Sequence, residues 1–123
     1  MYRVPPDLDL SAFVGATLNQ VALGPHDLQL HFDRASPAGA VAQASIWGRF
    51  ELYDPGGAVL EAGQASDLRT KRLPDLLGTA VVDACTDPPL AVVFTFATGH
   101  RLRLVDDTDQ YECFALEPGG VIV

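Results

Sequence analysis

Hydrophobic and polar positions alternate with a period of two over several short stretches, the pattern of a β-strand with one buried face. In 27–32, leucine and phenylalanine alternate with Gln29 and His31, and in 100–105 two leucines alternate with two arginines. The stretch 90–96 is apolar on both faces and indicates a well-covered strand. Further strands are expected over 16–23, 45–53, 58–62, 79–85 and 110–116, with a short piece at 121–123.

Glycine and proline mark the turns between these stretches. Gly24-Pro25 separates the first two strands and predicts a β-hairpin. Gly99 closes another hairpin and is expected to have a positive φ. In the strand predicted over 45–53, Gly48 falls on the apolar face, where it favours a bulge or a closely packed neighbour.

One helix is expected near the middle of the chain. Ser66 is a suitable N-cap for a helix that begins at Asp67, whose charge suits the first turn. Leucines spaced i, i+3 and i+4 then face the core, and a glycine ends the segment. These residues are Leu73, Leu76, Leu77 and Gly78.

A six-residue element occurs twice, which indicates an internal repeat. Leu10-Ser-Ala-Phe13-Val14-Gly15 matches Leu73-Pro-Asp-Leu76-Leu77-Gly78, 63 positions later, and Phe50-Glu-Leu52 matches Phe114-Ala-Leu116. We expect one domain over residues 1–123, with repeats at about 10–57 and 73–120. The predicted class is α+β, mainly antiparallel β, in which the duplicated β-unit forms a curved sheet or open barrel with one central helix.

Composition and charge narrow the functional classes. The chain has 123 residues, 48% of them hydrophobic and 20% charged, which favours a folded domain. Its longest apolar runs, about seven residues, are too short to span a bilayer, and its first residues lack a secretory signal, so we expect a soluble cytoplasmic protein. The net charge of −8 disfavours nucleic acid and membrane surfaces as partners. It suits solubility, as on an ordinary acidic bacterial surface, or else a basic protein partner.

The residues that carry chemistry are scattered. None of the three histidines stands at motif spacing from a serine or cysteine, and Cys85 and Cys113 are expected to be buried free thiols. No Cys/His ligand pattern is present, so the sequence predicts no catalytic residues, no metal site and no cofactor.

Two groups are candidates for partner binding. The acidic cluster favours a solvated loop first, a docking rim for a basic partner second, and a metal site last. Two aromatic residues on the outer face of the strand predicted over 45–53, with Arg49 between them, have the composition of a binding hot spot, unless the helix or the second unit covers that face. The candidates are Asp106, Asp107, Asp109 and Glu112 in the cluster, and Trp47 and Tyr53 on the strand.

The second half also carries a family resemblance. The segments Leu76-Leu-Gly-Thr-Ala-Val-Val, Leu90 through Phe94-x-Phe96-x-x-Gly99-x-x-Leu102-x-Leu104, and Tyr111-Glu112-Cys113-Phe114 resemble a family of small bacterial β-rich domains of unknown function. Some members lie beside polymorphic-toxin genes and are regarded as immunity proteins. The resemblance implies structural roles for Gly78, Gly99, Tyr111 and Glu112. This chain departs from the pattern at Thr98, where an acidic residue is usual, and at Cys113, which replaces serine.

Three hypotheses for function remain open at this point. The first is a non-catalytic protein-binding domain, an immunity-type protein that neutralises a basic toxin partner. The second is a small-molecule-binding or enzymatic domain with a cavity between the two repeats. The third is a structural homodimer in which the acidic or aromatic face is the subunit interface.

Overall fold

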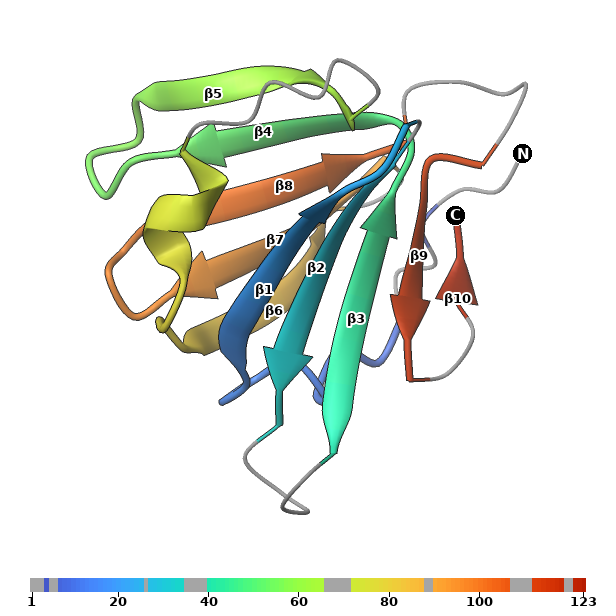
Figure 1. The fold of residues 1–123 in the computed structure, drawn as a ribbon, viewed down its shortest axis with the longest axis horizontal. Helices are drawn as coiled ribbons and strands as arrows, with labels where there is room; N and C mark the ends of the chain where they lie inside the picture. The colour runs from blue at the N-terminus through green and yellow to red at the C-terminus, as the bar shows by residue number, and fades with distance from the viewer. Residues whose placement is uncertain are drawn as a thin grey trace.

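The fold is built from antiparallel β-strands in two five-stranded sheets (Figure 1). The structure is a computed structural model, and it describes residues 4, 7–25, 27–34, 40–65, 72–87, 90–106, 112–118 and 121–123. The first sheet has the order β1-β2-β3-β9-β10, and the second has the order β5-β4-β8-β7-β6. The strands are β1 (Thr17–Leu23), β2 (Leu28–Asp33), β3 (Val41–Ile46), β4 (Arg49–Tyr53), β5 (Val59–Gln64), β6 (Val81–Asp87), β7 (Ala91–Phe96), β8 (Arg101–Val105), β9 (Phe114–Glu117) and β10 (Val121–Ile122).

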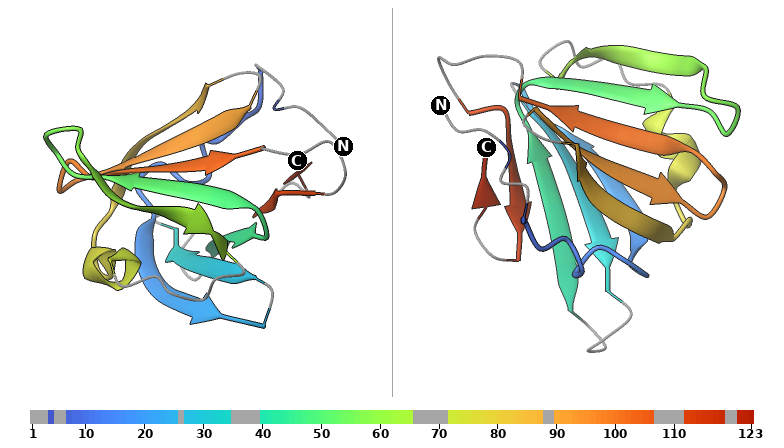
Figure 2. Two further views of the ribbon diagram at one scale, coloured as in Figure 1. Left: turned by 90° about the horizontal axis from the view of Figure 1, so that it is seen from above. Right: turned by 180° about the vertical axis from the view of Figure 1, so that it is seen from behind.

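The core lies between the two sheets, whose strands cross in Figure 1 and which separate into two layers when seen from above (Figure 2, left). Three aromatic rings meet at its centre: Phe32 from the first sheet, Phe94 from the second, and Phe13 from the turn before β1. The Phe13 ring centroid lies 5.6 Å from that of Phe32 and 4.9 Å from that of Phe94. Among the described residues, these side chains fill the space between the sheets around the three rings.

The two sheets have equivalent strand orders. Replacing β1 to β5 by β6 to β10, and the reverse, converts the order of the first sheet into that of the second. Each sheet therefore takes three strands from one half of the chain and two from the other. This exchanged arrangement is the one expected for two copies of a single β-unit related by a pseudo-twofold axis.

Backbone hydrogen bonds between the halves are reciprocal. The Gly15 N–H donates to the Val81 carbonyl at 2.7 Å, and the Gly78 N–H donates to the Leu18 carbonyl at 2.8 Å. Gly15 and Gly78 occupy equivalent positions in the two halves, 63 residues apart, and so do Leu18 and Val81. The two hydrogen bonds are therefore equivalent, with the roles of the halves exchanged. A second reciprocal pair joins Leu18 N–H to the Thr79 carbonyl (3.0 Å) and Val81 N–H to the Ala16 carbonyl (2.8 Å).

The axis can be located from an isolated bridge between Thr17 and Ala80, two positions that are equivalent by the same offset. The irregularities in pairing are equivalent as well. The register between β1 and β2 shifts between Leu18 and Gln20, and the register between β6 and β7 shifts between Val81 and Asp83. The likeness therefore extends to a matched irregularity in register next to the axis.

The predicted single strand over 45–53 is wrong, because the chain bends at Trp47-Gly48 and passes from the first sheet to the second. Both N–H groups of this bend donate to the Cys113 carbonyl, at 2.8 and 2.9 Å. A Cβ at Gly48 would lie 3.0 Å from the Cβ of Cys113, so the expected close-packed neighbour is confirmed. The first strand of the pair also begins earlier than predicted, at Val41.

The α+β class with a central helix is also wrong. The described residues form strands and one short 3₁₀ helix, η2 (Leu73–Leu76), with Pro74 in its first turn. Leu73 and Leu76 are buried, whereas Leu77 is exposed, so the leucine spacing builds a single turn. The expected helix start at Ser66 and Asp67 lies outside the described residues. Within the described part of the chain, no helix is long and apolar enough to cross a membrane.

Several local predictions are confirmed. The first hairpin pairs β1 with β2, and the second pairs β7 with β8 through the turn at Gly99. Gly15, Gly78 and Gly99 have φ values of 83°, 86° and 92°, a region that glycine enters without steric cost. The short C-terminal strand pairs with β9.

Candidate functional site on the outer face of the second sheet

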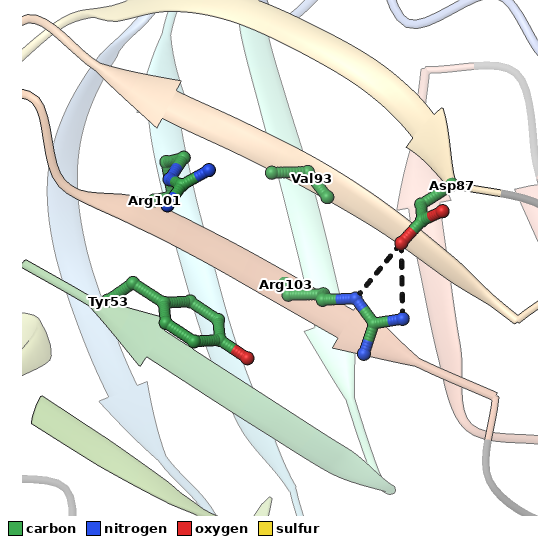
Figure 3. Close-up of a pocket in the computed structure, with 5 residues that line it drawn as sticks. All are labelled: Tyr53, Asp87, Val93, Arg101 and Arg103. Carbon is green, nitrogen blue, oxygen red and sulfur yellow. Dashed lines mark hydrogen bonds and ion pairs between the residues drawn. The ribbon is translucent and has the colours of Figure 1, made fainter. Parts of the chain in front are cut away.

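A shallow depression of about 180 Å³ lies on the solvent side of the second sheet (Figure 3). Its residues come from four adjacent strands, because alternate side chains of paired strands point to the same face. Tyr53 comes from β4, Arg101 and Arg103 from β8, Val93 from β7 and Asp87 from β6. The depression thus brings together an aromatic ring, two guanidinium groups, a carboxylate and an apolar floor.

Glu51, the neighbour of this depression on β4, organises its side chains. Its carboxylate accepts hydrogen bonds from Tyr53 Oη at 2.8 Å, Arg49 Nε at 3.1 Å and Arg103 Nη1 at 3.1 Å. Burial opposes the charge on Glu51, but the three hydrogen bonds outweigh it, and the pKa of Glu51 lies below its usual value. The carboxylate therefore stays ionised and holds three donors in place.

The partners of Glu51 are affected in the opposite direction. The hydrogen bond to Glu51, burial and the charge of the carboxylate together raise the pKa of Tyr53. Burial lowers the pKa of Arg103, but its bonds to Glu51 and Asp87 raise it overall. Arg103 Nε and Nη2 both reach Asp87 Oδ2, at 3.3 and 3.2 Å, so its guanidinium is oriented from two sides.

Arg101 is placed differently. Its guanidinium carbon lies 5.8 Å from the centroid of the Tyr53 ring, within the range of a cation–π contact. Among the described residues, the carboxylates of Glu51 and Asp87 bond Arg49 or Arg103, and no ion pair is formed by Arg101. Arg101 is also exposed, so its charge faces solvent.

The first sheet has uncharged side chains at most of the equivalent positions. The row that runs Thr95, Arg101, Tyr53 across the second sheet corresponds to His31, Gln43, Glu117 in the first. The row Val93, Arg103, Glu51 corresponds to Gln29, Ser45, Ala115. The first-sheet groups bond mainly to one another, as in the 3.0 Å bond from Gln43 Nε2 to Ser45 Oγ. At these positions the first sheet carries mainly amides and hydroxyls, together with His31 and Glu117, whereas the second sheet carries the arginine–tyrosine cluster.

The predicted site residues are dispersed. Tyr53 lines the depression, whereas Trp47 lies in the bend between the sheets and is only partly exposed. Asp106 is fully buried and therefore contributes nothing to an exposed acidic surface. Glu112 is exposed. Asp107, Asp109 and Tyr111 lie outside the described residues.

Asp106 and the cysteines form no recognisable reactive centre. Asp106 Oδ1 accepts from Cys113 Sγ at 3.4 Å, while its Oδ2 has no partner among the described residues. Cys85 is exposed, contrary to expectation, and partial burial together with the charges of Asp83 and Asp87 raises its thiol pKa. Over the described ranges, no three His, Cys, Asp or Glu side chains gather closely enough to hold a metal ion.

Sequence reasoning missed the role of Arg101 and Arg103. The signal was present, because both arginines fall on the polar side of a clearly alternating strand. Their convergence with Tyr53 depends on the pairing of β4 with β8, which lie about 50 residues apart and whose register the sequence does not state. No protein-family model, curated protein or solved structure matches this chain.

Proposed function

We propose that this chain is a non-catalytic protein-binding domain of the bacterial cytoplasm, which binds its partner through the outer face of the second sheet. The immunity-type protein implied by the family resemblance is the specific form of this proposal: a domain that binds a toxin and neutralises it. The overall charge of −8 favours a partner that is basic on average, because opposite net charges speed association.

The observation that carries the proposal is the contrast between the two outer faces. Both sheets have the same strand order and equivalent registers, so the fold makes the same demand on both outer faces. In the first sheet, uncharged polar side chains such as Gln43 and Ser45 are enough to cover the solvent-facing side. The shared strand order therefore does not require the arginine–tyrosine cluster of the second sheet, and this difference between the faces supports a binding role for the cluster.

The composition and order of this cluster also suit binding. Tyrosine and arginine are the residues most enriched in binding hot spots, after tryptophan. The hydrogen bonds of Glu51 already fix Tyr53 and Arg103, so a partner that contacts them loses little side-chain entropy on binding. Catalysis has less support, because the raised pKa of Cys85 keeps this exposed thiol protonated at neutral pH.

The test begins with the genes that neighbour the gene for this chain, among which we expect one that encodes a toxin, and uses that toxin as the candidate partner. We expect co-expression to protect cells and the purified proteins to form a complex. Tyr53→Ala should weaken that complex by at least about tenfold, the usual loss at a hot-spot aromatic residue. Gln43→Ala, in the equivalent row of the first sheet, is the matched control and should leave the affinity unchanged.

Two results would refute parts of this proposal separately. If cells are not protected and no complex co-purifies, the immunity form is wrong. If a complex forms but Gln43→Ala weakens it and Tyr53→Ala does not, the domain is a binding protein that uses the other face. Light scattering of the chain alone tests the homodimer hypothesis at the same time, because a stable dimer would show twice the 13.1 kDa mass.

A further inference from the structure

We infer that the depression beside Arg101 receives a carboxylate side chain, aspartate or glutamate, from the protein partner. The inference rests on the proposed function, because it names the chemistry that a partner presents to the second sheet. It concerns only one side chain at the centre of the contact. The rest of the partner surface is still expected to be basic, because the surface of this chain is acidic overall.

The numbers of positive and negative side chains around the depression differ by one. Three guanidinium groups lie on this part of the face, those of Arg49, Arg101 and Arg103, and two carboxylates, Glu51 and Asp87, bond two of them. Three positive and two negative charges leave one positive charge, in a chain whose net charge is −8. Asp83, a further acid on the strand that carries Asp87, lies across β7 from Arg101, two strand spacings or roughly 10 Å away.

The geometry leaves the Arg101 guanidinium available to a ligand. Its contact with Tyr53 at 5.8 Å positions the group without using an anionic acceptor. A guanidinium offers a planar fork of donors that matches the two oxygens of a carboxylate. Val93 provides an apolar floor against which the methylene groups of a glutamate or aspartate can pack.

The size of the depression fits one side chain. Its volume of about 180 Å³ exceeds the roughly 150 Å³ of an engineered cavity that binds benzene. The depression is open to solvent, so an inserted side chain can remain attached to a partner surface. A carboxylate side chain therefore fits without any movement of the four strands.

The acids on β6 disfavour a more highly charged ligand. Asp87 lines the depression and Asp83 lies on the same strand, β6, so a phosphate group or nucleic-acid backbone would meet repulsion on that side. A partner surface with a single carboxylate among basic residues suits the site, because the carboxylate can pair with Arg101 and the basic residues can pair with Asp83 and Asp87. This arrangement also agrees with a partner that carries the opposite net charge.

The site can be tested without the partner, with glutamate blocked at both ends as N-acetyl-glutamate N-methylamide. The probe is titrated into the ¹⁵N-labelled chain at constant ionic strength while the backbone amides and the arginine Nε–H groups are followed by NMR. We expect saturable shifts at Arg101 and its neighbours on β4 and β8. The blocked glutamine analogue, which has the same shape without the charge, should produce none.

Substitutions make the test specific. Arg101→Gln should weaken binding of the glutamate probe by roughly tenfold or more, because a charge-assisted hydrogen bond is lost. Arg101→Lys should keep part of the binding, since it keeps the charge and loses the fork. Arg72→Gln removes an arginine that pairs with Asp75 in η2, and this control should bind the probe as the unchanged chain does. Equal shifts with both probes, or full binding by Arg101→Gln, would overturn the inference.

The partner complex separates this inference from the proposed function. If the partner binds and Arg101→Gln weakens the complex about tenfold or more, both are supported. If the partner binds the second sheet, as judged by Tyr53→Ala, but Arg101→Gln has no effect, the carboxylate inference is wrong and the proposed function stands. If no partner binds, the proposed function fails, while the glutamate probe still decides whether the depression accepts a carboxylate.

Discussion

The substitution Glu51→Gln tests whether one carboxylate holds the arginine–tyrosine cluster together. The carboxylate accepts three hydrogen bonds, from Tyr53, Arg49 and Arg103. A glutamine keeps one oxygen acceptor, and its amide group places donors against the donors of the guanidinium groups. A hydrogen bond to a charged group contributes about 1.5–3 kcal/mol, but the arginine side chains are 38% and 29% exposed, so solvent screens them. We therefore expect a loss of about 1–2 kcal/mol in the free energy of unfolding at neutral pH.

The stability lost in Glu51→Gln should depend on pH, and the lowered pKa of Glu51 gives the direction of that dependence. Because the pKa of Glu51 in the folded chain lies below its usual value of 4.5, its charge stabilises the fold above that pH. That contribution is lost as the pH falls through the lowered pKa. The difference in stability between the unchanged chain and Glu51→Gln should thus be full at neutral pH and shrink in acid. Removing the carboxylate should also bring the raised pKa of Tyr53 back toward 10.0, which ultraviolet titration of the tyrosines detects.

The assay is urea unfolding at a series of pH values, with Asp75→Asn as the matched control. Asp75 loses the same charge, but it forms one exposed ion pair with Arg72, and such pairs contribute less than about 1 kcal/mol. The reasoning would be refuted if Glu51→Gln were no less stable than Asp75→Asn at neutral pH. It would also be refuted if the loss for Glu51→Gln were as large in acid as at neutral pH.

Three further predictions concern the frame and the thiols. Phe94→Ala empties a fully buried position between the sheets and should lower the free energy of unfolding by about 3–5 kcal/mol in urea; a loss under about 1 kcal/mol would contradict the described core. Gly15→Ala and Gly78→Ala should each lose about 1–2 kcal/mol, because both positions have a positive φ, and clearly unequal losses would count against their equivalence. With an excess of a thiol reagent, Cys85 should be modified in the folded chain, slowly at neutral pH because its pKa is raised, and Cys113 only after unfolding. Modification of both thiols in the folded chain would contradict the burial of Cys113.

The sequence predicted the strands well wherever one face alone is buried. The alternation over 27–32 and 100–105 corresponds to β2 and β8 because burial follows the same period of two. The break at Trp47-Gly48 was invisible to that reasoning. Buried and partly exposed residues continue to alternate across the bend, since both sheets turn their inner faces to one core.

The expected helix failed for a different reason. A spacing of i and i+3 fits one 3₁₀ turn as well as a longer helix, and the leucines at 73 and 76 need only that turn to reach the core. The equivalent residues of the first half, Leu10 and Phe13, are buried in the same way from a turn before β1. The repeated element was therefore a better guide to local structure than the helical spacing.

The candidate site was predicted only in part. Tyr53 was found because an aromatic residue on a polar strand face is unusual. The run of acidic residues from Asp106 suggested a solvated loop, whereas the first of them turns inward to the sulfur of Cys113. Charge along the sequence does not reveal which carboxylate finds a donor, and the partners of Arg101 and Arg103 lie on strands that are paired only in the folded chain.

The central claim is that the second sheet, and not its equivalent, presents the binding face. The most direct test is cross-saturation NMR on the ¹⁵N-labelled chain in complex with the protein partner that co-purifies with it, which identifies the amide groups at the interface. We expect saturation to reach β4, β7 and β8, around Tyr53 and Arg101. Saturation centred on β2, β3 and β9, around Gln43, would contradict the claim.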